Sequence, residues 1–187
     1  IAPPARRRYA AAMTPPLYRR AGEPDATTLS RLGRATFRET FGHLYPAEDL
    51  AEYLDRAYDP EETRRSLGDP SWASWLVESS SGQPLGYATA GPCSLPHPAV
   101  SGASLELKRF YLVRGAQSRG LGGVLFDQVM AWMAERSPPD IWIGVWSEND
   151  GAQRFYARRG FETIGEYGFP VGRTLDREFI LRRRPAF

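Results

Sequence analysis

The chain has 187 residues and a mass of 20.9 kDa, which is the size of one domain with one continuous core. Its composition, with 42% hydrophobic and 25% charged residues, excludes a disordered tail, a collagen-like repeat and a coiled coil. A formal net charge of +2 gives no overall field that indicates nucleic acid as a partner. No apolar run approaches the roughly 20 residues that a membrane span needs. The single cysteine, Cys93, excludes a disulfide framework and a cysteine-rich zinc site.

The first half of the chain predicts one short strand followed by helices. The strand covers residues 17–20, and Asp25 is a candidate N-cap for a helix that continues to about Phe41. Pro46 then occupies the first turn of a second helix, and residues 60–67 predict a short third one. The residues before this region, 1–12, mix proline, arginine and alanine and lack the apolar segment of a secretory signal.

The second half predicts strands mixed with helices. Strands at residues 75–77 and 85–90 form a hairpin through the turn at 79–82, and a loop rich in glycine, proline and serine follows. After this loop the predicted elements are, in chain order, a strand over 105–113, a helix over 120–136, a buried strand over 141–145, a helix opened by a Ser147–Asp150 capping box and ended by Gly160, and strands near 161–167 and 178–182. This is an α+β pattern.

A glycine-rich turn, residues 114–123, joins the strand at 105–113 to an apolar-faced helix. The free amides and positive dipole of a helix N-terminus favour phosphate, and glycines let the backbone approach it closely. A P-loop would need a lysine in the turn, but Lys108 is the only lysine and lies before it. A dinucleotide fingerprint starting at Gly120 would need glycine or alanine where Leu125 stands. The alternative is a turn that binds no ligand.

The turn resembles a motif of the GNAT superfamily of acetyl-CoA-dependent N-acetyltransferases. Gln117-x-x-Gly120-x-Gly122 is similar to the family's pyrophosphate motif, Q/R-x-x-G-x-G/A. A second block, which runs from Asn149 through Phe155 and Tyr156 to Phe161, resembles N-x-x-A-x-x-F-Y-x-x-x-G-F. The two blocks cover roughly residues 104–163. The sequence departs from the usual pattern at Arg114 and Ser118, where proline and glycine are frequent in the family.

The resemblance implies a single GNAT-like domain over residues 13–187, preceded by a flexible extension at 1–12 with Met13 as a candidate start. It implies a mixed, mostly antiparallel sheet of about six to seven strands flanked by helices, in which the strand ending at Val113 splays from the strand at 141–145. Acetyl-CoA would lie in this wedge, and the Leu112 amide would polarise the thioester carbonyl. The cofactor-binding residues that the resemblance implies are Phe110, Leu112, Val113, Gln117, Ser118, Arg119, Gly120, Leu121, Gly122, Gly123, Asn149, Phe155 and Tyr156. For Arg119, an exposed solubilising role is the alternative.

Two residues are candidates for proton transfer by this resemblance. Tyr156 stands at the family's tyrosine position and is the candidate acid for the departing thiolate, with a purely packed aromatic as the alternative. Glu106 lies eleven residues before Gln117, like the glutamate base of histone-type members, with a solvent-facing strand charge or a water chain as the alternatives. Cys93 is interpreted as a loop residue and not as a nucleophile, and His43 and His97 form no recognisable metal site.

The acceptor is predicted from an acidic segment, residues 39–62, which carries eight acidic residues and one base, Arg56. Residues 36–50 also resemble bacterial GNAT members that acetylate spermidine and spermine, and an acidic rim would attract such polyamines. A solvated helix face is the alternative. The sequence therefore predicts a cytoplasmic N-acetyltransferase that acts on a primary amine, either a small molecule or a polyamine, without metal, nucleic acid or membrane partners. The alternatives are acetylation of a protein N-terminus or lysine, and a sensor that binds acyl-CoA without turnover. The oligomeric state stays open, with a homodimer included.

Overall fold

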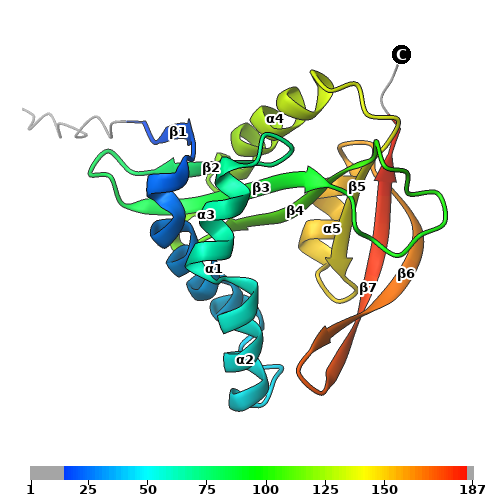
Figure 1. Cartoon of the computed structure of the whole chain (residues 1–187), viewed down its shortest axis with the longest axis horizontal. Helices are drawn as coiled ribbons and strands as arrows, with labels where there is room; N and C mark the ends of the chain where they lie inside the picture. The colour runs from blue at the N-terminus through cyan, green and yellow to red at the C-terminus, as the bar shows by residue number, and fades with distance from the viewer. Residues whose placement is uncertain (1–14, 185–187) are drawn as a thin grey trace, which may run out of the picture.

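A computed structural model describes residues 15–184 as one sheet with helices packed on both faces (Figure 1). The predicted extension at 1–12 lies outside the described residues. In chain order the elements are β1 (Leu17–Arg20), η1 (Glu23–Asp25), α1 (Ala26–Phe41), α2 (Ala47–Ala57), α3 (Pro60–Gly68), β2 (Ala73–Glu78), β3 (Pro84–Pro92), β4 (Leu105–Leu112), η2 (Arg114–Ala116), α4 (Leu121–Ala134), β5 (Ile141–Trp146), α5 (Asp150–Ala157), β6 (Glu162–Val171) and β7 (Thr174–Arg183). The predicted α+β class is confirmed.

The sheet contains seven strands in the order β1-β2-β3-β4-β5-β7-β6. All neighbouring strands are antiparallel except β4 and β5, which run parallel. Helices α4 and α5 cover one face, and α1, α2 and α3 cover the other (Figure 1). Within residues 15–184, no helix has the length and apolarity that crossing a membrane requires.

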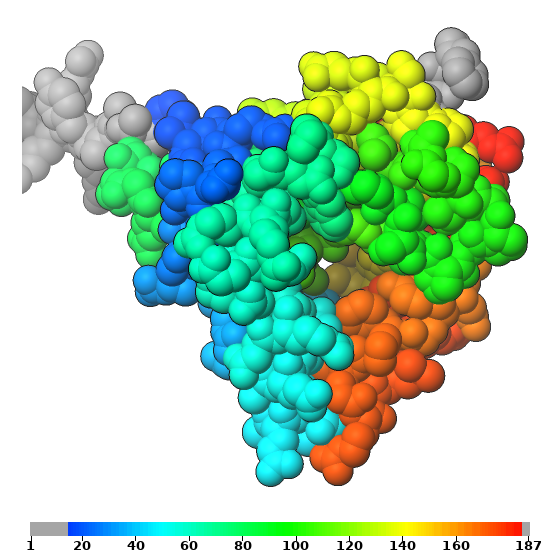
Figure 2. Space-filling model, viewed as in Figure 1, coloured from blue at the N-terminus to red at the C-terminus, as the bar shows by residue number. Residues whose placement is uncertain are grey.

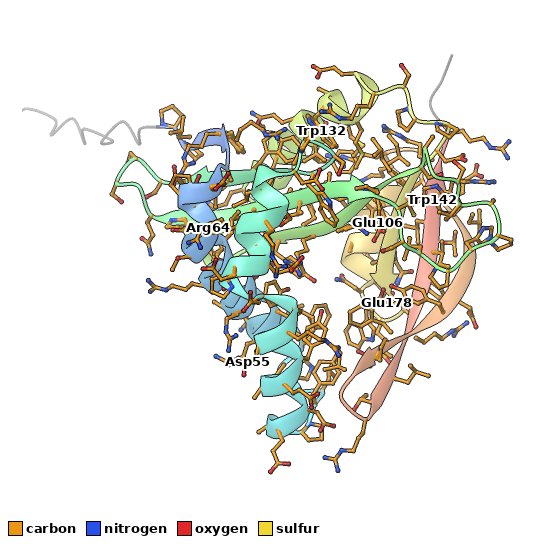
Figure 3. The ribbon with its side chains drawn as sticks, viewed as in Figure 1. Asp55, Arg64, Glu106, Trp132, Trp142 and Glu178 are labelled. Atoms are coloured by element: carbon orange, nitrogen blue, oxygen red, sulfur yellow. The ribbon has the colours of Figure 1, made fainter. Side chains whose placement is uncertain are left out.

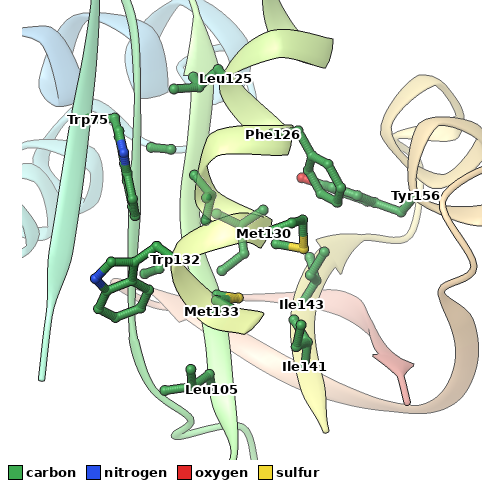
Figure 4. Packing of buried hydrophobic residues seen from close by; sticks show 14 of the residues in the cluster. Trp75, Leu105, Leu125, Phe126, Met130, Trp132, Met133, Ile141, Ile143 and Tyr156 are labelled. Atoms are coloured by element: carbon green, nitrogen blue, oxygen red, sulfur yellow. The ribbon is translucent and has the colours of Figure 1, made fainter. Parts of the chain in front are cut away.

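Side-chain alternation along the strands builds a separate core on each face. On β2, Trp75 and Val77 pack beneath α4, whereas Leu76 packs beneath α1. The core under α4 and α5 is the larger one and includes Phe126 and Tyr156 (Figure 4). The core under α1–α3 is rich in aromatic side chains.

Strands β4 and β5 splay apart, as the resemblance implies. They pair at only two positions, Leu105 with Ile141 and Glu106 with Trp142, and β4 then diverges from its neighbour. The divergence leaves the far half of β4 without a backbone partner on its β5 side.

A β-bulge on β4 determines which face of the sheet each of its side chains points toward. Arg109 pairs with Thr89, but the next pair on β3 joins Ala90 to Leu107, so one extra residue interrupts the alternation. Leu107 and Phe110 therefore both pack in the core beneath α4 and α5. Glu106 and Arg109, three residues apart, both face the α1–α3 side, where they line the same pocket.

Two local predictions need correction. Helix α5 starts from Asn149 and not from a capping box at Ser147, because the Asn149 Oδ1 atom accepts a hydrogen bond from the Ala152 amide at 3.0 Å. The last two strands are longer than predicted. They form one hairpin that turns at Gly172, whose φ is +57°, and glycines and Pro170 in β6 conceal its strand pattern in the sequence.

Candidate active site

The turn between β4 and α4 presents free backbone amides. Gly120 is the N-cap of α4 with φ +79°, and a side chain there would meet no atom within 4 Å. Ser118 also has a positive φ of 58°. Among the described residues, no backbone carbonyl accepts a hydrogen bond from the amides of residues 118–122. Open space, left-handed backbone and unpaired amides at a helix N-terminus fit a pyrophosphate group.

The end of β4 is held so that one edge of the strand stays open. The Val113 amide donates to the Leu85 carbonyl of β3 at 2.9 Å, so the neighbouring Leu112 directs its amide and carbonyl toward β5. The side chain of Gln117 donates from Nε2 to the Leu112 carbonyl at 3.0 Å. Gln117 therefore braces the turn against the strand, and the Leu112 amide faces the opening between β4 and β5.

The other predicted cofactor residues lie along the same opening or behind it. The closest atoms to a side chain built at Gly122 belong to Leu112 and Phe110, at 3.6 Å from each. Arg119 is exposed. Leu121, Gly122 and Gly123 form the half-buried first turn of α4. Phe155 stacks against Phe110 with ring centroids 5.6 Å apart, while the Asn149 side chain caps α5.

Tyr156 lies on the α5 side of the sheet within a cluster of aromatic rings (Figure 4). It is 6% exposed, and Phe126 and Phe161 have ring centroids 6.2 and 6.0 Å away. Burial raises the pKa of its hydroxyl above the ordinary value, so the hydroxyl keeps its proton at neutral pH. The side chain is packed as a core residue, and it also retains a proton to donate.

A pocket of about 450 Å³ opens on the opposite face, between the α1–α3 helices and strands β3–β7. In Figure 2 it appears as the hollow between α3, the loop before β4 and the β6–β7 hairpin. Ten of the side chains that line it are aromatic, namely Phe37, Phe41, Tyr45, Tyr53, Tyr58, Trp72, Tyr111, Trp146, Tyr167 and Phe169. Residues of both β4 and β5 line it, so the pocket lies beside the splay between these strands.

Glu178 on β7 projects into this pocket (Figure 3). Its Oε2 atom accepts a hydrogen bond of 2.5 Å from the Tyr167 hydroxyl on the paired strand β6. Burial, reinforced by the charges of Asp176 and Glu106, raises the pKa of Glu178 to about 6. A side chain at Gly144 of β5 would approach Glu178 Oε2 to 2.9 Å, so glycine at that position makes room for the carboxylate. A carboxyl group with this pKa can accept a proton near neutral pH.

Glu106 lines the same pocket but is already engaged (Figure 3). Its Oε2 atom lies 2.7 Å from Lys108 Nζ and accepts a hydrogen bond from the Ser94 amide at 2.9 Å. Accepting a proton would weaken both contacts. The role of Glu106 as a base stays a prediction, and Glu178 is the second candidate.

The acidic segment at 39–62 contributes less to the pocket than expected. Its carboxylates are mostly in ion pairs or caps, as with Asp49 and Arg173 at 3.2 Å and Asp55 and Arg34 at 2.6 Å. Of the eight acidic residues, only Glu62 lines the pocket. The helices supply aromatic walls instead, and most of the acidic groups come from strands.

Sequence reasoning missed Glu178, Tyr167 and Arg109. The predicted last strand began only at Glu178, whereas β7 begins at Thr174, so the alternation that places Asp176 and Glu178 on one face was not recognised. The face of Arg109 depends on the bulge, for which the sequence carries no clear signal. Tyr167 is identified only by its cross-strand pairing with Glu178.

Cys93 and His97 do not line the pocket. Burial raises the pKa of the Cys93 thiol to about 11, which keeps it protonated and a poor nucleophile. The His97 ring packs on Trp142, with centroids 5.3 Å apart. Within residues 15–184, no group of three histidine, cysteine or acidic side chains is arranged to hold a metal ion.

Comparisons with known proteins agree with this geometry. The profile of the acetyltransferase (GNAT) family matches residues 34–161, more than half of the chain. An N-acetyltransferase of unassigned substrate from Lactobacillus delbrueckii subsp. lactis is 29% identical over 161 residues, which are 86% of this chain and 92% of that protein. A phosphinothricin N-acetyltransferase of Streptomyces coelicolor is 32% identical over 71% of this chain and 78% of its own length. The PaiA N-acetyltransferase of Thermoplasma acidophilum, solved with coenzyme A, superposes with a TM-score of 0.70 at 17% identity, covering 92% of this chain and all of that one.

Proposed function

Because the chain belongs to the acetyltransferase (GNAT) family, we propose that it transfers the acetyl group of acetyl-CoA to the primary amine of a small molecule. One observation carries the proposal: the open edge of β4 lies between a turn of free amides and a pocket that contains a carboxyl group of raised pKa. The relatives named N-acetyltransferases, and the coenzyme A complex of PaiA, support the reaction and the co-substrate. The enclosed aromatic walls favour a small acceptor over a protein.

Binding of acetyl-CoA, polarisation of its carbonyl and protonation of its leaving sulfur are assigned to backbone amides and one tyrosine. Bound acetyl-CoA supplies a thioester carbonyl that the amine attacks. The amides of residues 118–122 would hold its pyrophosphate, and the Leu112 amide would stabilise the negative charge that develops on the carbonyl oxygen. Tyr156, which retains its proton, would donate it to the leaving sulfur.

The acceptor side needs a group that takes a proton from the amine, because an ammonium ion has no lone pair with which to attack. Glu178 suits this step, since its pKa of about 6 lets it accept a proton at neutral pH. Its hydrogen bond from Tyr167 orients the carboxylate in the pocket. Glu106 is the rival, and its contacts with Lys108 and Ser94 favour a supporting charge role.

The test is release of free CoA by the purified chain, given acetyl-CoA and a panel of amines. The panel contains amino acids, aromatic and aliphatic monoamines, spermidine, and peptides with free N-termini and lysines. Saturable CoA release with at least one small amine is expected. Release with peptides alone would overturn the small-molecule acceptor. Acetyl-CoA binding without release on any amine would leave a non-catalytic module and overturn the function.

A further inference from the structure

Arg109 is a charged pocket residue without an opposite charge. Its guanidinium carbon lies 4.4 Å from the centroid of the Tyr58 ring, and its Nη2 atom donates to the Ala57 carbonyl. Among the described residues, no carboxylate lies within ion-pair distance of it. Arginine stays protonated at any working pH, so this positive charge is permanent.

The other charged groups that line the pocket have partners. Arg65 pairs with Glu62 at 2.5 Å, and Lys108 pairs with Glu106 at 2.7 Å. Asp69 accepts a hydrogen bond from the Ser71 amide at 2.8 Å, and Asp176 accepts one from the Tyr45 hydroxyl. Glu178 has a hydroxyl partner, and within residues 15–184 no cation pairs with it. The pocket therefore presents one unpaired positive group, Arg109, together with the carboxyl groups of β7.

The residues around Arg109 carry no formal negative charge. They are Tyr53, Tyr58, Tyr87 and Tyr111, whose neutral rings and hydroxyls leave the guanidinium without a counter-charge. The β4 bulge places the guanidinium on the pocket face, so the fold directs the charge into the cavity. A planar guanidinium matches a carboxylate in shape and can donate two parallel hydrogen bonds to it.

We propose that the acceptor is an amine that also bears a carboxylate, and that Arg109 binds this carboxylate while the amine lies toward Glu178. This inference rests on the proposed function and defines the acceptor class. An acceptor with both charges complements both unpaired groups of the pocket. A polyamine would instead bring a second positive charge toward Arg109, and like charges repel.

The experiment compares acids with their amides. Wild-type kcat/KM is measured for matched pairs, such as phenylalanine with phenylalaninamide and leucine with leucinamide, and for spermidine. We expect at least a tenfold preference for the acid. Amidation lowers the pKa of the neighbouring amine and frees more of its lone pair, so a preference for the acid cannot come from amine ionisation.

Two variants assign the preference to Arg109. Arg109→Gln should raise KM for the acids at least tenfold and leave kcat/KM for the amides within about twofold, and Arg109→Lys should restore part of the preference. Arg65→Gln is the matched control, because that pocket arginine is already paired with Glu62, and it should keep the wild-type preference.

Equal turnover of acids and amides by the wild type, or an unchanged preference in a folded Arg109→Gln, would overturn the inference. If Arg109→Gln does not fold, as judged by thermal melting, the wild-type comparison alone decides. CoA release with amides or spermidine, but not with acids, would contradict this inference. The proposed function would still stand. No release with any amine would sink the proposed function itself.

Discussion

The two faces of the sheet carry two different candidate binding sites, one built from backbone amides and the other from side chains. On the α4–α5 face, the candidate cofactor site consists of backbone amides and an apolar core, and its parts lie close together in the sequence. On the α1–α3 face, the pocket draws side chains from three helices and five strands, which lie far apart in the sequence. A site made of backbone depends on local conformation, whereas a site made of side chains depends on how distant elements pack. The two faces should therefore respond independently to substitution.

The largest expected effect lies on the pocket face. Glu178→Gln should lower kcat about 100-fold, since the proton acceptor is lost, without changing the affinity for acetyl-CoA. In the wild type, kcat/KM should rise as the pH passes through about 6, because protonated Glu178 cannot accept a proton below that value, and the variant should lack this limb. The pH dependence of kcat/KM for CoA release, measured for the wild type and for Glu178→Gln, tests this prediction. Glu166→Gln, which alters an exposed carboxylate on β6, is the control and should behave as wild type.

Glu106→Gln is a second variant that tests which of the two carboxylates accepts the proton. If Glu106 and not Glu178 is the base, the rate falls mainly in Glu106→Gln, and Glu178→Gln keeps most of its turnover. That result would transfer the proton-accepting role to β4 and contradict the assignment to Glu178.

The next effect lies on the cofactor face. Gly120→Val should weaken acetyl-CoA binding at least tenfold, because a β-branched residue resists φ +79° and the turn must rearrange. Gly115→Ala is a matched control in the same turn, where a methyl group meets nothing within 4 Å and φ is not positive. Calorimetric titration with CoA measures both. Wild-type affinity in a folded Gly120→Val would show that the turn does not cradle the cofactor.

Tyr156→Phe should have a smaller effect, on chemistry alone. It removes the hydroxyl from a ring whose packing stays the same, so we expect about a tenfold loss in kcat with CoA affinity and melting temperature nearly unchanged. Steady-state kinetics and melting curves measure these quantities. Unchanged turnover would mean that Tyr156 serves packing only.

The smallest effect is expected at Asn149, where two substitutions distinguish helix capping from cofactor binding. Asn149→Ala should reduce the free energy of unfolding by about 1 kcal/mol, since the Ala152 amide loses its cap. Asn149→Asp keeps an acceptor oxygen and should preserve stability. Denaturant unfolding measures the difference. A loss of CoA affinity in the stable Asn149→Asp variant would indicate a direct role in cofactor binding beyond the cap.

Much of the cofactor face could be predicted because its signals are local. Glycines, a helix start and an apolar helix face lie within about twenty residues, and local chemistry alone places Gly120 at the start of α4. The resemblance to the acetyltransferase family rested on these residues, and the family match confirms it. The acceptor face could not be predicted in the same way. The acidic helices were expected to form it, but their carboxylates pair with arginines that lie elsewhere in the chain.

The α+β class, most of the elements and the glycine turn follow from local signals, because periodicity, caps and turn residues act over a few neighbouring positions. Which charges stay unpaired depends on how distant elements pack. One extra residue in the bulge of β4 turns Arg109 toward the same pocket as Glu106, and strand pairing sets Glu178 beside Tyr167. Asp49 and Asp55 are paired with Arg173 and Arg34, which lie far from them in the sequence, and the nearly balanced composition of the chain does not reveal such pairings.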